Sequence, residues 1–309
     1  MRDQQISATN GLIARASIRA SDLPLAGASR ATGLAIVTGI DGPSYRPLGA
    51  TMVLAADGEL RGSISSGCID ADIARHVAEV VQSGQARQLR YGMGSPFRDL
   101  ELPCGGGLDI RVLLAPAEGE LTRIVADLEA RKTLHLWLGE ALRDEPVPGA
   151  SMQMVVDPDP RFAVFGKGPE AVAFARMTAA AGYETVLVSP DDETLAAAEG
   201  NRLCPVRLLP AGAFDVRMDA HTAAVLFFHD HDLEPEILSR LLPGPAFYVG
   251  AQGSHRTAER RLQRLRERGV DETALARLRG PIGVIPSTRD PRTLAASVLA
   301  EILAEACRR

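Results

Sequence analysis

Apolar residues in the second half of the chain alternate between short continuous runs and stretches of helical spacing. Runs rich in β-branched and aromatic residues predict strands, whereas apolar positions that recur every three or four residues predict helices. The predicted strands span residues 162–165, 184–188, 206–209, 223–228 and 246–249, and the predicted helices span 169–181, 191–199, 234–242, 254–268 and 290–307. This alternation predicts a Rossmann-like, doubly wound parallel sheet with helices on both faces.

The first half has a different pattern, in which short strands follow one another with few helices between them. The predicted strands span residues 33–38, 49–54, 60–64, 85–91, 108–114 and 134–138, and a second predicted helix spans 118–131. The first helix should start near Ile69 and end before Gly84, because apolar residues recur at helical spacing between them. We therefore expect an N-terminal mixed α/β domain.

Proline-rich polar stretches separate the two halves. Residues 143–149 contain two prolines and several charges, and Asp157-Pro-Asp-Pro160 forms a second break. Few contacts cross such stretches in multidomain proteins. We expect a boundary near Pro160, with one domain over residues 1–158 and a second, ending in C-terminal helices, over 159–309.

The composition argues against two classes of partner. The chain has 309 residues, a formal net charge of −5 and only 4% aromatic residues. A nucleic-acid surface needs a basic stripe and stacking rings, so we expect no nucleic-acid partner. We recognise no signal peptide and no run of about 18 apolar residues, so we expect no membrane segment and a cytoplasmic location. None of the four cysteines forms a C-x-x-C pair, and their spacings fit neither a disulfide framework nor a structural zinc site. Since we recognise no secretory signal, we expect reduced thiols.

A glycine turn follows the first strand of the Rossmann-like half. Gly166-Lys-Gly168-Pro-Glu-Ala171 fits the G-x-G-x-x-A pattern of turns that bring a phosphate to a helix N-terminus. However, Pro169 lacks an N–H, Glu170 would repel a phosphate, and Ser189 stands where an acidic residue would bind a ribose. Nucleotide binding and a purely structural turn both remain open.

Two cysteines in the first half lie beside glycines. Cys68 ends Gly62-Ser-Ile-Ser-Ser-Gly-Cys68 at a predicted strand-to-helix turn, where helix amides favour a thiolate, which is a nucleophile and a soft metal ligand. Cys104 begins Cys104-Gly-Gly-Gly107, within a long polar loop. The alternatives are a buried small side chain for Cys68 and a flexible loop for Cys104. Two such turns in one domain favour a shared site.

His229-Asp230 directly follows a predicted buried strand. Residues at that strand end face the crevice in which open α/β sheets bind ligands. His229 and Asp230 are candidates for a proton donor and the group that orients it.

Taken together, these segments resemble the XdhC/CoxI family of molybdenum-cofactor maturation proteins. The motifs that carry the resemblance are Gly42-Pro-Ser-Tyr-Arg-Pro-Leu-Gly-Ala-Thr-Met52, the turn from Gly62 to Asp70, Cys104-Gly-Gly-Gly107, Phe165-Gly-Lys-Gly-Pro169, His229-Asp230, Tyr248-Val-Gly-Ala-Gln-Gly-Ser254 and Gly280-Pro-Ile-Gly283. Their order and spacing extend over most of the chain. Pro169, Ser189 and Pro286 depart from the family pattern, and all three lie in the second domain.

The resemblance implies a two-domain, cytoplasmic homodimer that binds the molybdopterin cofactor. Such a protein assists sulfuration and insertion of the cofactor into a molybdenum hydroxylase such as xanthine dehydrogenase, and is an accessory chaperone rather than a turnover enzyme. A cysteine desulfurase is a further partner that the resemblance suggests. The family also leaves open a nucleotide at the Rossmann turn.

The resemblance further implies which residues contact the cofactor. Cys68 and Cys104 would hold the molybdenum or its sulfur. Residues expected near the pterin phosphate are Arg46, Ser65, Ser66, Gly67, Gly105 and Gly106, and further cofactor contacts are expected at Gly166, Gly168, His229 and Asp230.

Two other functions fit parts of the sequence. The glycine turn and parallel sheet suggest an NAD(P)-dependent oxidoreductase. Six arginines between Arg256 and Arg268 suggest instead a docking protein with a vestigial Rossmann domain, in which this helix is a phosphate or partner surface. A solvated helix is the simpler interpretation of the same arginines.

Overall fold

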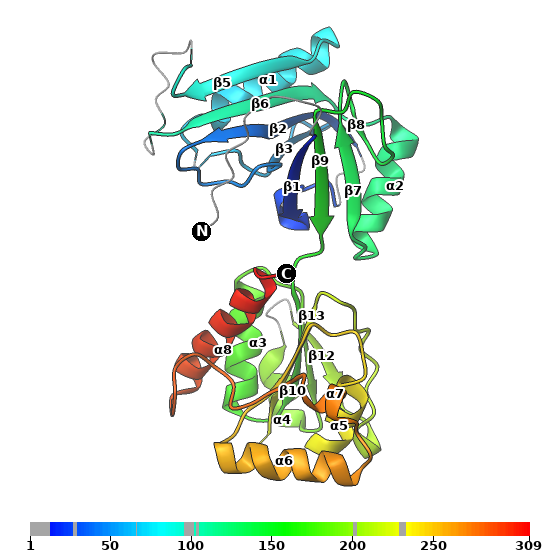
Figure 1. The fold of residues 1–309 in the computed structure, drawn as a ribbon, viewed down its shortest axis with the longest axis vertical. Coiled ribbons are helices and arrows are strands. Elements are labelled where there is room, and N and C mark those ends of the chain that lie inside the picture. The colour runs from blue at the N-terminus through cyan, green and yellow to red at the C-terminus, as the bar shows by residue number, and fades with distance from the viewer. Residues whose placement is uncertain are drawn as a thin grey trace. The chain divides into compact units, whose positions relative to one another are not determined.

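The computed structural model describes residues 13–26, 30–65, 67–95, 102, 105–199, 203–228 and 233–309. The chain divides into two compact units, Met1–Asp159 and Pro160–Arg309. Each unit has its own sheets and hydrophobic cores, so each is described by itself (Figure 1).

The first unit contains an antiparallel five-stranded sheet in the order β4-β3-β2-β6-β5. These strands span Leu60–Arg61, Thr51–Ala55, Ala31–Asp41, Gly107–Leu114 and Arg87–Gly92. In β2, Ala35 and Val37 contribute to one core, whereas Leu34 and Ile36 contribute to another on the opposite face. The strand is buried on both sides, which explains its continuous apolar run.

Helix α1, Asp70–Ser83, covers one face of this sheet. Its residues Ile73, Val77 and Val80 are buried in the core that the helix shares with the sheet. The helix ends at Gly84, whose φ of 71° lies in the left-handed region that favours glycine. The predicted helix and its end are confirmed.

A second sheet, in the order β1-β9-β7-β8, shares its core with the other face and with helix α2. Its strands span Ala14–Arg19, Met152–Asp157, Leu134–Leu138 and Leu142–Arg143, α2 spans Glu118–Glu129, and a short 3-10 helix spans Ala20–Asp22. β1 and β9 form a parallel pair, with Ala16 aligned to Met154. The sequence pattern did not predict β1 or β9.

The second unit contains six parallel strands in the order β12-β11-β10-β13-β14-β15. They span Cys204–Arg207, Thr185–Ser189, Arg161–Gly166, Thr222–Phe227, Tyr248–Ala251 and Leu278–Arg279. This order runs outward on both sides from the pair β10 and β13, as in doubly wound dinucleotide-binding folds. The predicted Rossmann-like sheet is confirmed, although β15 was not predicted.

Helices cover both faces of this sheet. Their spans are Pro169–Ala180 for α3, Asp192–Ala198 for α4, Glu234–Leu241 for α5, His255–Glu267 for α6, Glu272–Leu275 for α7 and Pro291–Ala306 for α8, and a 3-10 helix spans Pro210–Gly212. α3, α4 and α8 pack on one face, and α5, α6 and α7 pack on the other.

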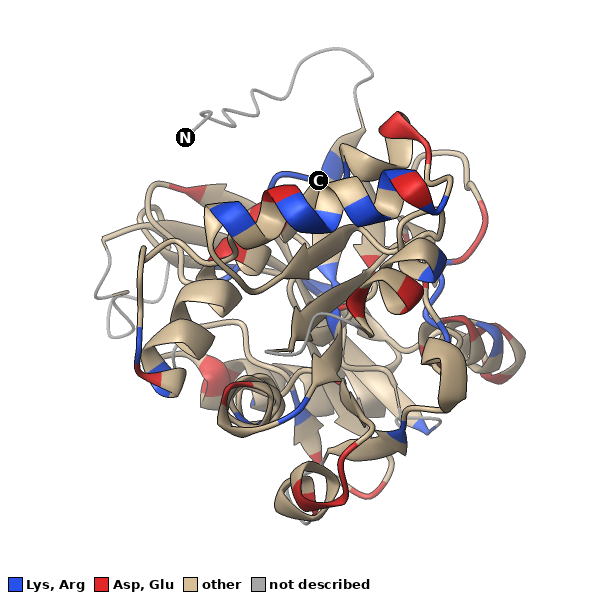
Figure 2. Cartoon of the chain, turned by 90° about the horizontal axis from the view of Figure 1, so that it is seen from below, with Lys and Arg blue, Asp and Glu red and all other residues tan. Residues whose placement is uncertain are grey.

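Basic residues recur along α6 (Figure 2). In the part of the chain that the structure describes, no helix is long and apolar enough to cross a bilayer.

Candidate functional site

Cys68 lies exposed in the turn between β4 and α1. The turn is fastened to the first residue of α1, because the Asp70 carboxylate accepts four hydrogen bonds from it. The donors are the Ser63 hydroxyl (2.6 Å), the Ile64 amide (3.3 Å), the Ser65 amide (2.9 Å) and the Ser65 hydroxyl (2.8 Å). The helix dipole favours a carboxylate at this position. The turn therefore holds Cys68 in a defined place at the surface.

The amides expected near a phosphate already have partners within this turn. The Ser65 amide donates to Asp70, and the Ser65 hydroxyl oxygen accepts from the amides of Gly67 (3.1 Å) and Ile69 (3.3 Å). An incoming phosphate would have to compete with these bonds. Ser66 lies outside the described residues. Among the described groups of the turn, the exposed thiol is therefore the one best placed to meet a ligand.

The glycines of the second cysteine motif allow backbone segments to touch. A Cβ on Gly106 would lie 2.3 Å from the Pro43 carbonyl oxygen, and a Cβ on Gly92 would lie 2.1 Å from the Gly106 carbonyl oxygen. Only glycine fits such contacts. The glycine run thus joins the start of β6 to the loop after β2 and to the end of β5.

Cys104 lies outside the described residues, but neighbours on both sides are placed. Leu102 is buried in the core beneath α1. The Gly105 amide donates to the Leu102 carbonyl oxygen at 2.8 Å. Leu102, two residues before Cys104, therefore belongs to the same core as Ile64 and Ile69 of the Cys68 turn.

One hydrogen bond joins α1 to the strand that leads into this segment. The Tyr91 hydroxyl, near the end of β5, donates to Asp72 Oδ2 in the first turn of α1 at 2.5 Å. Burial and the Asp72 carboxylate raise the pKa of Tyr91, which keeps its hydroxyl a donor. Burial acts to raise the pKa of Asp72, but hydrogen bonds from Tyr91 and Arg75 outweigh it and lower that pKa. The Cys68 turn and the Gly105–Gly106 segment thus lie at the same end of the sheet.

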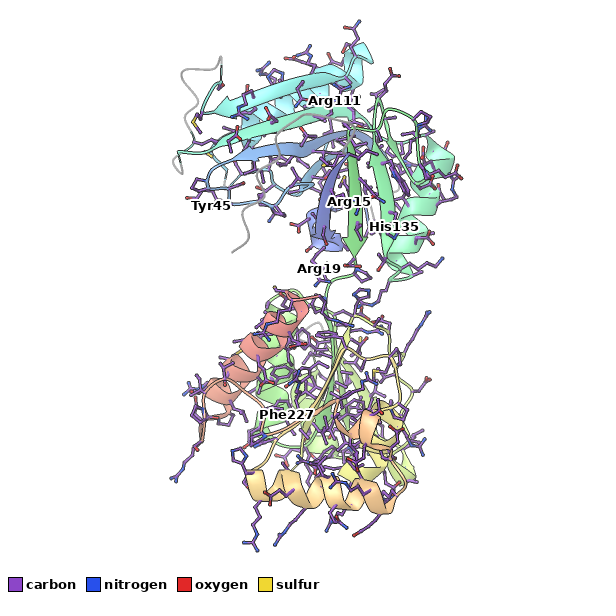
Figure 3. All side chains as sticks on the ribbon, in the orientation of Figure 1. Arg15, Arg19, Tyr45, Arg111, His135 and Phe227 are labelled. Atoms are coloured by element: carbon purple, nitrogen blue, oxygen red, sulfur yellow. The ribbon has the colours of Figure 1, made fainter. Side chains whose placement is uncertain are left out.

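Arg46 lies on the loop between β2 and β3 that also contains Pro43. Its Nη2 donates to Asp22 Oδ1 at 2.7 Å. Its Nε is buried and has no hydrogen-bond partner among the residues that the structure describes. A buried N–H of this kind is costly unless it meets an acceptor, so it suits an anionic ligand. On the same loop, Tyr45 is 61% exposed (Figure 3).

A polar cluster that the sequence pattern did not reveal lies beside the glycine segment. Arg90 forms an ion pair with Asp109 at 3.0 Å and another with Asp41. Gly107 leaves room for it, because a Cβ there would lie 2.3 Å from Arg90 Nη2. Alternation along β5 could have identified Arg90 as surface-facing, but not its partners, which come from β2 and β6.

In the second unit, the Gly166–Gly168 turn packs closely against the neighbouring strand, and the Gly168 amide already has a hydrogen-bond partner. A Cβ on Gly166 would lie 2.4 Å from the carbonyl oxygen of Phe227. Phe227, which Figure 3 labels, ends β13. The Gly168 amide donates to the Thr194 hydroxyl at 2.9 Å. Pro169 begins α3 and offers no N–H. The turn therefore packs the sheet closely but offers few donors to a phosphate.

The remaining predicted contacts of the second unit, His229 and Asp230, are outside the described residues; they follow the buried Phe228 in the sequence. Ser189 ends β11 and is buried, and its hydroxyl oxygen accepts from the Asp191 amide at 3.2 Å. The Ser189 hydroxyl thus forms a hydrogen bond within the turn that follows β11.

Two units of this kind, a cysteine-bearing mixed α/β domain and a Rossmann domain, define a class of two-domain proteins. Residues 25–92 match the XdhC and CoxI family, and residues 162–302 match the XdhC Rossmann domain. The chain is also 34% identical over 281 residues to the molybdenum cofactor insertion chaperone PaoD of Escherichia coli K12, covering 87% of this chain and 82% of that protein. The chain belongs to the XdhC and CoxI family.

More distant relatives agree with this assignment. The chain is 22% identical to a probable xanthine dehydrogenase subunit of Bacillus subtilis, with 87% of this chain and 92% of that protein aligned. A crystal structure described as a xanthine dehydrogenase from Bacillus halodurans has a TM-score of 0.73 at 21% identity, and the match covers 93% of this chain and 95% of that one. At this identity the structural match shows the fold alone.

Proposed function

We propose that this chain binds the molybdenum cofactor as cargo and assists its insertion into a molybdenum hydroxylase. The relative that is 34% identical is named as a molybdenum cofactor insertion chaperone. The observation that carries the proposal is the placement of Cys68, exposed in a hydrogen-bonded turn at the sheet end where Leu102 and Gly105 also lie.

In this proposal Cys68 and Cys104 contact the molybdenum or its sulfur. A thiolate is a soft ligand suited to that role. Within the described ranges, no three His, Cys, Asp or Glu side chains are grouped to hold a metal ion. The proposal needs no such group, because the cofactor brings its molybdenum with it.

Arg46 is the group that we propose for the anionic end of the cofactor. Its buried Nε has no hydrogen-bond partner among the described residues, and its Nη2 is already paired with Asp22. A guanidinium held in this way can offer one free N–H to a phosphate oxygen without losing its orientation. Ser65, Ser66, Gly67, Gly105 and Gly106 remain candidate neighbours of the same phosphate, although the Ser65 and Gly67 amides would first have to leave their present partners.

A nucleotide at the Rossmann turn is the second candidate ligand, with Gly166, Gly168, His229 and Asp230 as its neighbours. The strand order favours it, because ligands of such sheets bind outside the carboxyl ends of the strands. The occupied Gly168 amide and the absent Pro169 N–H count against it. An NAD(P)-dependent oxidoreductase would need the same phosphate donors, so we propose the chaperone function in preference to it.

The proposal extends to partners and location. A molybdenum hydroxylase such as xanthine dehydrogenase would be the client, and a cysteine desulfurase would supply sulfur. We further propose a homodimer in the cytoplasm, which native mass spectrometry and cell fractionation would test.

The binding step can be tested directly. We expect the protein, purified from a host that makes the cofactor, to release a fluorescent pterin on oxidative denaturation. Cys68→Ser should retain about tenfold less pterin, because the loss of one metal–thiolate contact is a large part of a small ligand's affinity. Cys204→Ser removes an exposed cysteine of the second unit and should retain as much as wild type.

The two negative outcomes have different meanings. A wild-type protein that neither carries nor takes up pterin would refute cofactor binding itself. Equal pterin content in wild type, Cys68→Ser and Cys204→Ser would refute only the assignment of Cys68.

A further inference from the structure

A pocket of about 130 Å³ lies between the start of α5 and one face of α6. Its lining consists of Glu234, Pro235, Thr257, Arg260, Arg261 and Arg264. Both helices begin at the carboxyl edge of the parallel sheet, after β13 and β14. The pocket is therefore at the edge where open α/β sheets bind ligands, and none of its lining residues belongs to the Gly166–Gly168 turn.

The floor of the pocket is a buried ion pair. Arg261 donates to both carboxylate oxygens of Glu234, at 2.9 and 3.1 Å, and their side chains are only 2% and 1% exposed. Arg261 Nη2 also donates to the Gln252 carbonyl oxygen at 2.6 Å. A two-pronged pair with a further backbone bond has a fixed geometry. The Arg261 and Glu234 side chains are therefore held in place without a bound ligand.

Arg260 provides the free positive charge. It is exposed, and among the described residues it has no ion pair and no side-chain hydrogen bond. Arg264 lies one helical turn further along the same face, so the two side chains line the same pocket.

The lining fits a phosphate group. Three guanidinium groups and one carboxylate line the pocket, and Thr257 adds a hydroxyl. A phosphate ester carries nearly two negative charges and three strong acceptor oxygens, which guanidinium groups bind well. A volume of about 130 Å³ is below the range of pockets that enclose whole drug-sized ligands, so it suits one group of a larger molecule.

We propose that this pocket binds the phosphate group of a phosphomonoester. The inference does not depend on the proposed chaperone function, because a pterin phosphate and a nucleotide share this chemistry. It places a phosphate site of the second unit at α5 and α6 rather than at the glycine turn.

The test is a titration of the full chain with inorganic phosphate at constant ionic strength, followed by ³¹P line broadening. We expect saturable binding that Arg260→Gln weakens about tenfold, because a charge-assisted bond is lost. The matched control is Arg256→Gln, which removes an exposed arginine one turn earlier on α6 and outside the pocket lining. It should weaken binding less than about twofold. Circular dichroism melting of each variant checks that the fold is intact.

A parallel titration with AMP distinguishes the sources of the phosphate. AMP that binds more tightly than phosphate, and that Arg260→Gln weakens, would support the pocket and favour a nucleotide. AMP that binds no more tightly than phosphate would support the pocket and favour a different ester.

Three outcomes would overturn the proposal. One is the absence of saturable phosphate binding by wild type. Another is an equal loss in Arg256→Gln and Arg260→Gln, which would indicate a diffuse basic surface suited to an acidic protein. The third is phosphate or AMP binding that Arg260→Gln leaves unchanged.

Discussion

Single glycines in this protein mark places where two backbone segments come into contact. The two glycine motifs make such contacts in different units of the chain. Gly106 packs against the Pro43 carbonyl beside the candidate cofactor site, whereas Gly166 packs against the Phe227 carbonyl within the Rossmann sheet. The sequence identifies both motifs, because glycine at a turn is a local signal. It does not reveal which carbonyl each glycine meets, since both partners come from distant segments.

Gly166→Ala should therefore destabilise the second unit. Its Cβ would lie 2.4 Å from the Phe227 carbonyl oxygen, so β10 or β13 would have to shift. We expect a loss of about 2 kcal/mol in the free energy of unfolding, measured by urea denaturation.

Gly119→Ala is the matched control for this substitution. Gly119 lies in α2, and nothing lies within 4 Å of the position of its Cβ. Alanine should be neutral there or stabilise the helix by up to about 1 kcal/mol. An unfolding free energy of Gly166→Ala equal to that of wild type would contradict the close contact between β10 and β13.

At the scale of elements, the sequence predicts α1 and the central strands well, because their apolar residues are local and periodic. It fails at β1 and β9. The β1 sequence, Ala14–Arg19, alternates small and apolar residues with arginines and serine, and its partner β9 lies more than a hundred residues away. This short alternation is a weak strand signal, and nothing in it indicates a parallel pairing with so distant a strand. The hydrogen bond from Tyr91 to Asp72 likewise joins two elements whose contact only the fold defines.

Tyr91→Phe should weaken the link between β5 and α1. We expect it to lower the free energy of unfolding by about 1–2 kcal/mol at neutral pH, because a buried bond to a carboxylate is lost. The folded-state pKa of Asp72 is lowered, so its stabilising effect is present above the unfolded pKa of about 4 and is lost as pH falls through the folded value. The difference between wild type and Tyr91→Phe should therefore shrink in acid.

Tyr45→Phe provides the comparison, since Tyr45 is 61% exposed. Its unfolding free energy should stay within about 0.5 kcal/mol of wild type at every pH. If the gap between wild type and Tyr91→Phe were as wide at pH 3 as at pH 7, the role of the ionised Asp72 carboxylate would be wrong.

At the scale of the whole molecule, motif order along the chain identifies the family and the two-domain class. The candidate site is only partly predictable. The sequence motifs identify Cys68, Cys104 and Arg46. The structure adds the exposed position of Cys68 and the buried Arg46 Nε, which has no hydrogen-bond partner in the described ranges. Arg90 and the pocket floor of Glu234 and Arg261 were not predicted, because each joins elements whose pairing only the fold defines.

The central functional proposal is that this protein delivers the molybdenum cofactor to a client. The most direct test mixes the cofactor-loaded protein with a cofactor-free molybdenum hydroxylase and measures the recovered hydroxylase activity. We expect a higher yield than with an equal amount of free cofactor, and a yield close to that of free cofactor when Cys68→Ser replaces wild type. Equal recovery from loaded wild-type protein and free cofactor would contradict the chaperone function.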